Sequence, residues 1–432
     1  MNILVIGSGG REHALVKTLA RNNSAGRRLQ LFCAPGNDGI APHAQCAAIS
    51  VTGIHALADF AAEMNIDLTI VGGETSLAAG IVDEFEQRGL LIAGPRAAAA
   101  RLESSKVFAK NFMARHNVPT ARFRVADSVA GAREILRSGE FGAADNPVVV
   151  KADGLAGGKG VTVARSHAEA EQAAVELLND AAPDSKGISP PRVLIEEALE
   201  GREASLLLFA DGRDYKLMPA ARDHKRVGEN DTGPNTGGMG AITAPDVLDS
   251  EGLARVVREV VEPTLMGARD EGFPFRGVLF VGLMLTAEGA RVLEYNVRFG
   301  DPEAQAILVR LQSDLTNIFE AVARGKLGET SVEWSDEASA VVVLAARGYP
   351  SQPETGARIE GLEKAARVPS VEIFHAGTKR AEDGGWLTAG GRVLNVASHA
   401  STLDESLARC YAAVNEIHWD GMHFRRDIGR FK

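Results

Sequence analysis

The amino-acid sequence predicts a multidomain protein of mixed α/β and α+β class, with a parallel-sheet domain first and a small α+β domain last. Its 432 residues exceed what one compact core usually holds, which indicates about two to four domains. Short apolar strands alternate with helical segments up to about residue 100, as is typical of a parallel sheet. Longer β-rich stretches follow. We therefore predict domains at 1–103, 104–335 and 336–432.

The first domain opens with a strand, a glycine turn and a helix, predicted at 2–6, 7–10 and 12–21. A dinucleotide-binding fingerprint requires glycine where the sequence has Glu12, and an acidic residue at the end of the second strand, which is missing. The turn either binds a phosphate or carboxylate at the helix N-terminus or is only a tight connection. The remaining elements of this domain are a strand at 29–33, a helix at 54–64 and a strand at 68–71.

The second domain carries a glycine-rich loop directly after a predicted strand at 148–151. A Walker A loop would need glycine at 153 and serine or threonine at 160, whereas the sequence has Asp153 and Gly160. Lys151 and Lys159 nevertheless bracket the glycines, and this arrangement favours a polyphosphate ligand over a plain surface turn. Around this loop we predict helices at 106–116 and 168–179, a surface loop at 180–191 and a strand at 193–197.

A third glycine cluster, 233–240, follows the charged stretch 222–226. These residues form either a second anion site or a solvated loop. His224 is either part of the site or an ordinary surface histidine.

A predicted hairpin, with strands at 277–285 and 290–299, carries the sharpest chemical signal. Period-two alternation places Glu294, Asn296 and Arg298 on one face, together with Val292. Leu293, Tyr295, Val297 and Phe299 would form the apolar face. A carboxylate and an amide oxygen are ligands that suit Mg²⁺, and the arginine would neutralise phosphate or carboxylate. The alternative is the polar outer face of an edge strand.

A further strand is predicted near Ala338 and would begin the last domain.

Charge and cysteine content exclude several classes of protein. With 57 acidic and 47 basic residues the net charge is -10, so nucleic acid is not an expected partner. Cys33, Cys46 and Cys410 have neither disulfide-framework nor zinc-site spacing. No basic leader precedes the first strand, and no apolar run approaches the roughly 18 residues that a membrane helix needs. We expect a cytoplasmic protein without a membrane partner.

Six segments in order resemble the ATP-grasp ligases, and most closely the phosphoribosylamine–glycine ligase (glycinamide ribonucleotide synthetase) family. They are GSGGREHAL from Gly7, APGNDG from Ala34, Ser105-Lys106, VVVKADGLAGGKGV from Val148, DHKR from Asp223 with TGPNTGGMGA from Thr232, and EYNVRFGDPEAQA from Glu294. The resemblance spans the whole chain. It implies an ATP-grasp core with a mobile lid subdomain at about 120–197, and a monomer acting on the small molecules glycine and 5-phosphoribosylamine.

The resemblance also implies roles for individual residues. Lys151 and Arg298 would be catalytic, and Glu294 and Asn296 would bind Mg²⁺ or Mn²⁺. The expected ATP-binding residues are Lys106, Lys151, Gly157, Gly158, Lys159, Glu196, Glu197, Leu199 and Glu203. The expected substrate-binding residues are Gly9, Gly10, Glu74, Asp223, Lys225, Asn235, Thr236, Arg298, Gly300 and Asp301.

The chain departs from the family pattern at 71–77, VGGETSL, where two expected prolines are missing around Glu74. This places the detail of the substrate contacts in question but not the reaction. The implied reaction joins glycine to phosphoribosylamine through a glycyl phosphate and releases ADP and phosphate. The alternative is another ATP-grasp carboxylate–amine ligase or a carboxylase. An NAD-dependent oxidoreductase is disfavoured by Glu12, and a noncatalytic nucleotide-binding module by the intact metal and phosphate residues.

Overall fold

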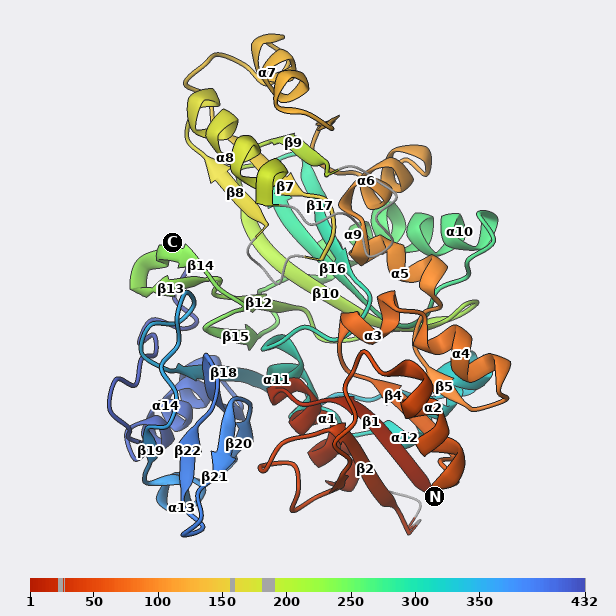
Figure 1. Cartoon of the computed structure of the whole chain (residues 1–432), viewed down its shortest axis with the longest axis vertical. Helices are drawn as coiled ribbons and strands as arrows, with labels where there is room; N and C mark the ends of the chain where they lie inside the picture. The colour runs from red at the N-terminus through yellow and green to blue at the C-terminus, as the bar shows by residue number, and fades with distance from the viewer. Residues whose placement is uncertain (22–25, 27, 156–159, 181–190, 432) are drawn as a thin grey trace.

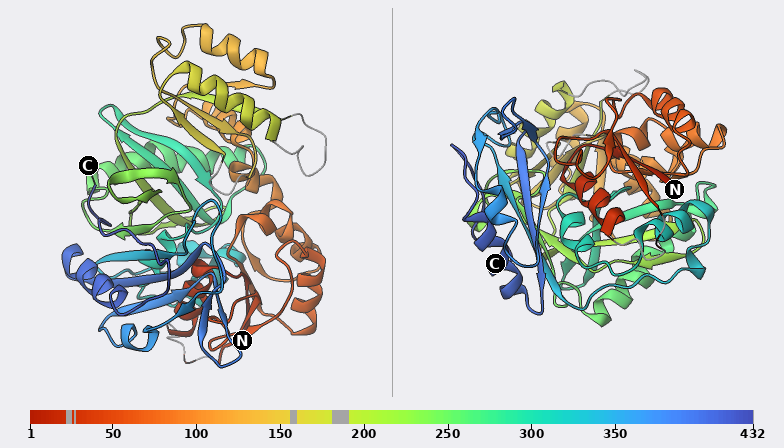
Figure 2. Two further views of the ribbon diagram at one scale, coloured as in Figure 1. Left: turned by 60° about the vertical axis from the view of Figure 1, so that its left-hand side comes forward. Right: turned by 90° about the horizontal axis from the view of Figure 1, so that it is seen from below.

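The computed structural model describes residues 1–21, 26, 28–155, 160–180 and 191–431. Figure 1 shows a central sheet with a smaller α/β layer above it, the N-terminal domain below it on one side and the C-terminal strands below it on the other. The rotated views in Figure 2 show the same arrangement. Among the described residues, no helix combines the length and apolar character needed to cross a membrane.

The N-terminal domain is a five-stranded parallel sheet with strand order β3-β2-β1-β4-β5. Its strands are β1 Asn2–Gly7, β2 Gln30–Pro35, β3 Gln45–Cys46, β4 Leu68–Val71 and β5 Ile92–Ala93, and its helices are α1 Gly10–Arg21, α2 Ile54–Glu63, α3 Glu74–Ala78, α4 Ile81–Gln87 and α5 Ala97–Ser104. The apolar residues of β1 and β4 are buried, as expected where helices cover both faces. Because parallel strands end at one edge, the turn after β1 and the loop after β4 lie together.

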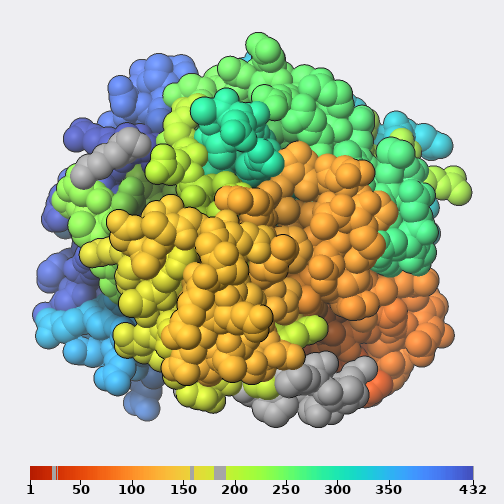
Figure 3. Space-filling view, turned by 90° about the horizontal axis from the view of Figure 1, so that it is seen from above, coloured from red at the N-terminus to blue at the C-terminus, as the bar shows by residue number. Residues whose placement is uncertain are grey.

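The upper layer, residues 123–180 and 193–197, is a four-stranded antiparallel sheet with order β6-β9-β7-β8 and its own apolar core. Its elements are β6 Phe123–Ala126, α7 Val129–Arg137, β7 Val148–Ala152, β8 Val161–Ala164, α8 His167–Asp180 and β9 Val193–Glu197. Helix α6, Lys106–Arg115, leads into it. Seen from above, this layer covers the middle of the molecule (Figure 3).

The central sheet has nine strands, and its main path runs β17-β16-β10-β12-β15-β18-β23-β20, with β11 paired to β10. These strands are β10 Arg202–Asp211, β11 Tyr215–Leu217, β12 Ala221–Asp223, β15 Gly240–Thr243, β16 Arg276–Thr286, β17 Gly289–Asn296, β18 Ala338–Ala345, β20 Val371–His375 and β23 Arg392–Ala400. Strand β18, where the predicted C-terminal domain begins, pairs with β15 on one side and β23 on the other. Strands β18, β20 and β23 of the C-terminal region therefore extend the central sheet.

Shorter elements surround this sheet. They are β13 Arg226–Gly228, β14 Thr232–Asn235, α9 Ser250–Val256, a π-helical turn Val257–Val261, α10 Glu262–Asp270, α11 Glu303–Leu308, α12 Leu315–Arg324, β19 Arg358–Ile359, α13 Leu362–Ala365, β21 Thr378–Arg380, β22 Trp386–Thr388 and α14 Leu403–Val414, with single 3-10 turns at Glu229–Asp231 and Leu327–Glu329. Helix α11 follows the predicted hairpin directly and places its first turn under the central sheet.

The predicted hairpin is present, but the predicted alternation along its second strand is wrong at one end. Gly282 of β16 pairs with Glu294 and Leu283 pairs with Val292, so Leu293 is an extra residue in a β-bulge. The bulge turns Val292 into the buried core, where it is fully inaccessible, instead of leaving it on the face of Glu294.

Beyond the bulge the alternation is as predicted, although β17 ends at Asn296 and not at Phe299. Tyr295, Val297 and Phe299 are buried, and Glu294 and Asn296 face the other way. The predicted polar face is therefore real, but it lines a cavity rather than solvent.

Candidate functional site

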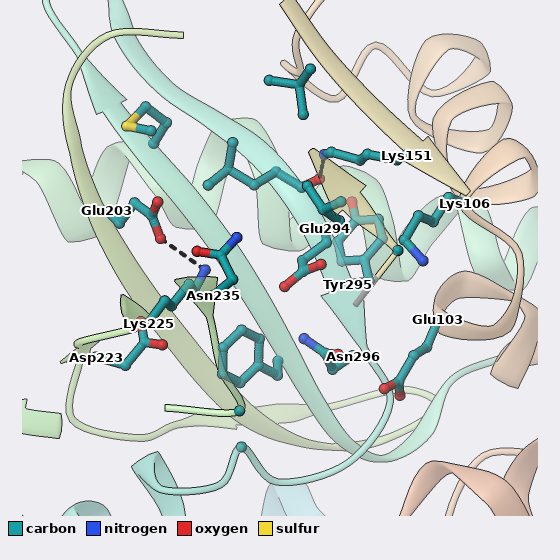
Figure 4. A pocket seen from close by; sticks show the side chains of 18 of the residues that line it. Glu103, Lys106, Lys151, Glu203, Asp223, Lys225, Asn235, Glu294, Tyr295 and Asn296 are labelled. Carbon is teal, nitrogen blue, oxygen red and sulfur yellow. Dashed lines mark hydrogen bonds and ion pairs between the residues drawn. The ribbon is translucent and has the colours of Figure 1, made fainter. Parts of the chain in front are cut away.

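A cavity of about 780 Å³ lies between the upper layer, the central sheet and the edge of the N-terminal sheet (Figure 4). Most of the predicted site residues line it: Glu74, Lys106, Lys151, Glu196, Glu197, Leu199, Glu203, Asp223, Lys225, Asn235, Thr236, Glu294, Asn296, Arg298, Gly300 and Asp301. Gly157, Gly158 and Lys159 lie outside the described residues. The sites predicted from separate segments thus converge on one cavity.

Gly9 and Gly10 are not among the residues that line the cavity. The carboxylate of Glu12, which is 2% exposed, turns back into the glycine turn and accepts a hydrogen bond from the Gly9 N–H at 2.6 Å. A Cβ at Gly10 would lie 2.3 Å from Nδ2 of Asn395, because α1 packs closely on β23 there. In this structure the glycine turn holds the chain's own Glu12 side chain.

Two buried lysines share one carboxylate at the back of the cavity. Lys110 and Lys151 each place Nζ 3.0 Å from Oε2 of Glu196. Lys151 also donates to the carbonyl oxygen of Leu293 at 3.1 Å, an oxygen on the extra residue of the β-bulge. Burial lowers the pKa of Lys110 to about 8, against the attraction of Glu196. This network fixes Lys151 beside the strand that carries Glu294.

Lys110 was missed by the sequence reading, although it lies four residues after Lys106 on the same face of α6. It also donates to Oγ1 of Thr120 at 2.7 Å, and Thr120 donates to the Val292 carbonyl at 2.6 Å. Lys106 itself donates to the Gly154 carbonyl at 2.8 Å, and burial lowers its pKa. The three lysines place concentrated positive charge along one wall.

We expect Lys110→Met to lower the free energy of unfolding of the ligand-free protein by about 2 kcal/mol. Removing one partner of a buried ion pair costs about 3–5 kcal/mol, and here Glu196 retains Lys151. Denaturant unfolding measures this loss. In a double-mutant cycle with Glu196→Gln, the two losses should be smaller together than their sum, whereas additive losses would contradict the shared network.

Glu294 and Asn296 point into the cavity from the end of β17 (Figure 4). Within the described part of the chain, neither side chain makes a hydrogen bond or ion pair. Burial acts to raise the pKa of Glu294, but Lys225, Lys151 and Lys106 outweigh it, and the pKa lies below its ordinary value. An ionised carboxylate beside an unpaired amide oxygen is a donor set that fits Mg²⁺ or Mn²⁺.

Arg298 follows β17 and is held by two carboxylates. Its Nε lies 3.0 Å from Oε2 of Glu74, and its Nη2 lies 2.8 Å from Oε1 of Glu103. The second oxygen of Glu103 accepts the Val297 N–H at 2.8 Å. Glu74 is the first residue of α3, and its ion pair with Arg298 anchors the loop in which the two prolines are missing.

Two of the expected ATP-binding residues differ in how they meet the cavity. The side chain of Glu197 turns away to Arg122, whose Nε lies 2.7 Å from Oε2, and its N–H donates to the Arg122 carbonyl at 3.1 Å. Glu203 instead pairs with Lys225, with Nζ 2.8 Å from Oε2 (Figure 4). A residue predicted for ATP and one predicted for substrate are therefore in direct contact.

The remaining substrate candidates lie at the lower end of the cavity. Thr236 donates both its N–H and its hydroxyl to the Lys225 carbonyl, each at 2.8 Å, which fixes the loop that also carries Asn235. Asp301 lies 3.2 Å from Nη2 of Arg392, a residue of β23. Sequence reasoning missed Arg392, since nothing local in the chain marks it as a partner of Asp301.

Gly300 and Glu303 form the floor of the cavity. A Cβ at Gly300 would lie 2.3 Å from Oε2 of Glu303, so only glycine leaves room for that carboxylate. Glu303 is 4% exposed and lines the cavity. It is part of the EYNVRFGDPEAQA segment, but the sequence alone did not predict a role for it. Burial raises the pKa of Glu303 to about 7 and that of nearby Asp223 to about 6.

The interpretation of His224 as a surface histidine is wrong. It is 1% exposed, its ring stacks on Phe431 with centroids 4.2 Å apart, and its Nε2 accepts the Gly429 N–H at 2.9 Å. Burial lowers its pKa to about 4. His224 therefore holds the C-terminal segment against the site rather than facing the cavity.

Three family models together match most of the chain. The models for the N domain, the ATP-grasp (A) domain and the C domain of phosphoribosylglycinamide synthetase match residues 1–103, 104–304 and 339–431. The chain is 48% identical over 432 residues to the phosphoribosylamine–glycine ligase of Xanthomonas axonopodis pv. citri, covering 99% of this chain and 97% of that protein. It is 45% identical over 429 residues to that of Brucella melitensis biotype 1, with 99% and 97% covered.

Solved structures agree with this match. The crystal structure of phosphoribosylamine–glycine ligase from Thermotoga maritima is similar with a TM-score of 0.82 and 33% identity, over 99% of this chain and 100% of that one. A biotin carboxylase from Campylobacter jejuni is similar with a TM-score of 0.72 but only 16% identity, over 98% and 92% of the two chains. The second likeness shows a shared fold alone.

Proposed function

The chain belongs to the phosphoribosylglycinamide synthetase family, and from this premise we propose how its cavity joins glycine to phosphoribosylamine. The family reaction is an ATP-dependent ligation in purine biosynthesis. A carboxylate does not react with an amine because its oxygen is a poor leaving group. Transfer of the γ-phosphoryl group of ATP to the glycine carboxylate gives a glycyl phosphate, which the ribosylamine nitrogen then attacks, releasing phosphate.

ATP lies between the upper layer and the central sheet, with adenine at the end of β9. Glu196, Glu197 and Leu199 line that end of the cavity, and the Glu197 side chain turns away from it toward Arg122. Glu203 holds the ribose hydroxyls after it releases Lys225. Lys106 and Lys151 hold the phosphates, together with the loop residues Gly157, Gly158 and Lys159.

Glu294 and Asn296 hold the divalent metal, Mg²⁺ or Mn²⁺. When bound there, the metal neutralises phosphate charge during phosphoryl transfer. Lys151 and Arg298 orient and neutralise the transferred group from the protein side. Because these groups are already fixed by Glu196, Glu74 and Glu103, little reorganisation is required when ATP binds.

Glycine and phosphoribosylamine occupy the lower end of the cavity. The residues proposed to bind them are Glu74, Asp223, Lys225, Asn235, Thr236, Arg298, Gly300 and Asp301. Gly9 and Gly10 adjoin this region through Asp301, whose Oδ2 lies 3.6 Å from where a Cβ of Gly9 would be. Exclusion of water from this end protects the acyl phosphate from hydrolysis.

The domain division 1–103, 104–335 and 336–432, with a mobile lid at about 120–197, belongs to the same proposal. The separate core of the upper layer and the bounds of the three family models support it. A monomer is part of the same proposal. A cytoplasmic location is supported by the use of ATP as substrate.

Convergence of Glu294, Asn296 and Arg298 with Lys106 and Lys151 in one cavity carries this proposal. Glycine labelled with ¹⁸O in its carboxylate tests it. We expect one ¹⁸O to appear in the released phosphate for each glycinamide ribonucleotide formed, with one ADP per product. Unlabelled phosphate would contradict the glycyl phosphate, and ADP release that does not depend on phosphoribosylamine would contradict coupled ligation.

A further inference from the structure

Glu303 is a buried carboxylate at the cavity floor, and the reaction proposed above assigns no role to it. It is the first residue of α11 and is 4% exposed. Its Oε1 lies 3.4 Å from the Ser205 hydroxyl, a long contact, and within the described residues it makes no salt bridge. A carboxylate this buried normally has a close cation. Its position against Gly300 leaves its second oxygen at the cavity wall.

Charges of both signs lie around Glu303. Asp223 on β12 repels its ionised form, while Lys225 after β12 and Arg298 after β17 attract it. Arg392 on β23 also interacts with it. Burial is the largest influence, followed by Asp223, and together they raise the pKa of Glu303 to about 7. The carboxylate is thus about half ionised at neutral pH and is a stronger base than an exposed glutamate.

We propose that Glu303 is the general base that takes the proton from the ribosylamine nitrogen as the amide bond forms. This inference rests on the glycyl phosphate route proposed above. The neutral nitrogen attacks the acyl carbon, the C–N bond forms and the C–O bond to phosphate breaks, with its electron pair leaving on phosphate. The nitrogen then carries one proton too many, which passes to the Glu303 carboxylate and from there to solvent.

Asp223 has a positioning and tuning role in this step. It lines the same cavity, and its negative charge keeps the pKa of Glu303 high. Lys225 is a cation paired with Glu203 and is unsuited to accept a proton, and Glu294 is occupied with the metal in our proposal. Among the described acidic residues in the cavity, Glu74, Glu103 and Asp301 are already paired with arginine.

Glu303→Gln tests the proposal. We expect kcat to fall about 10³-fold, in the range typical of a lost general base. With all three substrates present, phosphoryl transfer should continue, so exchange of oxygen between the β,γ-bridging position and the β-non-bridging positions of ¹⁸O-labelled ATP should persist. Glu303→Asp should recover part of the rate, because a shorter carboxylate still accepts the proton.

The pH profile separates a base from a structural residue. In the wild type, kcat should fall as pH drops below about 7, because Glu303 becomes protonated. This acidic limb should vanish in Glu303→Gln and move to lower pH in Asp223→Asn, where the repelling charge is gone. An unchanged limb in Glu303→Gln, or loss of oxygen exchange together with product, would overturn the assignment. Absence of ¹⁸O transfer from glycine in the wild type would instead overturn the glycyl phosphate itself.

Discussion

Glu294→Gln is expected to lower kcat about 10³-fold, a loss of about 4 kcal/mol of transition-state stabilisation. Glutamine has the shape of glutamate but removes a negative charge that lies near Lys106, Lys151 and Lys225 and has no ion-pair partner among the described residues. Without that charge the pair of oxygen donors loses most of its attraction for a divalent cation. Turnover measured at increasing Mg²⁺, with Mn²⁺ binding followed in parallel, checks both consequences.

Glu288→Gln is the matched control for this variant. Glu288 lies at the tip of the same hairpin, its side chain is 81% exposed, and its ion pair with Arg291 is a surface one. Its replacement should leave turnover and metal dependence unchanged, and both proteins should remain folded. Near-normal, metal-dependent turnover in Glu294→Gln would show that Glu294 is not a metal ligand.

The polar face of β17 was predictable because it is a local property. From Glu294 to Arg298, side-chain alternation alone predicts which residues face the cavity and which are buried in the core. Glycine turns and lysine-bracketed loops were equally visible, since each occupies a few consecutive positions. The bulge at Leu293 was not visible, because it depends on how β16 pairs with this strand.

The sequence did not reveal which side chain occupies the glycine turn or which side chains pair with the residues of the cavity. Glu12 fills the glycine turn that appeared ready for a ligand, and this is seen only when α1 is built back onto the turn. Glu103 and Arg392 reach the site from segments far from their partners Arg298 and Asp301. Their roles depend on the packing of three domains around one cavity. No local pattern in the sequence therefore marks them as site residues.

The same packing gives Arg298 two functions, a stabilising one and a catalytic one. A single substitution would remove both at once. Arg298→Met removes the cation from Glu103, whose side chain is 6% exposed, and leaves a buried carboxylate without its partner. A broken buried pair of this kind costs about 3 kcal/mol or more in the free energy of unfolding. It also removes a donor that faces the transferred phosphoryl group in our proposal, which typically costs about 10²–10³-fold in kcat.

Arg298→Met should therefore be measured in the Glu103→Gln background as well as alone. The glutamine amide oxygen can still accept the Val297 N–H, so the double variant should regain most of the lost unfolding free energy. Its kcat should stay about 10²–10³-fold below that of Glu103→Gln, with little change in KM for ATP, because the lost interaction acts mainly in the transition state. If kcat recovers together with stability, Arg298 only supports the loop. If KM for ATP rises while kcat holds, Arg298 binds the nucleotide and does not assist the transfer.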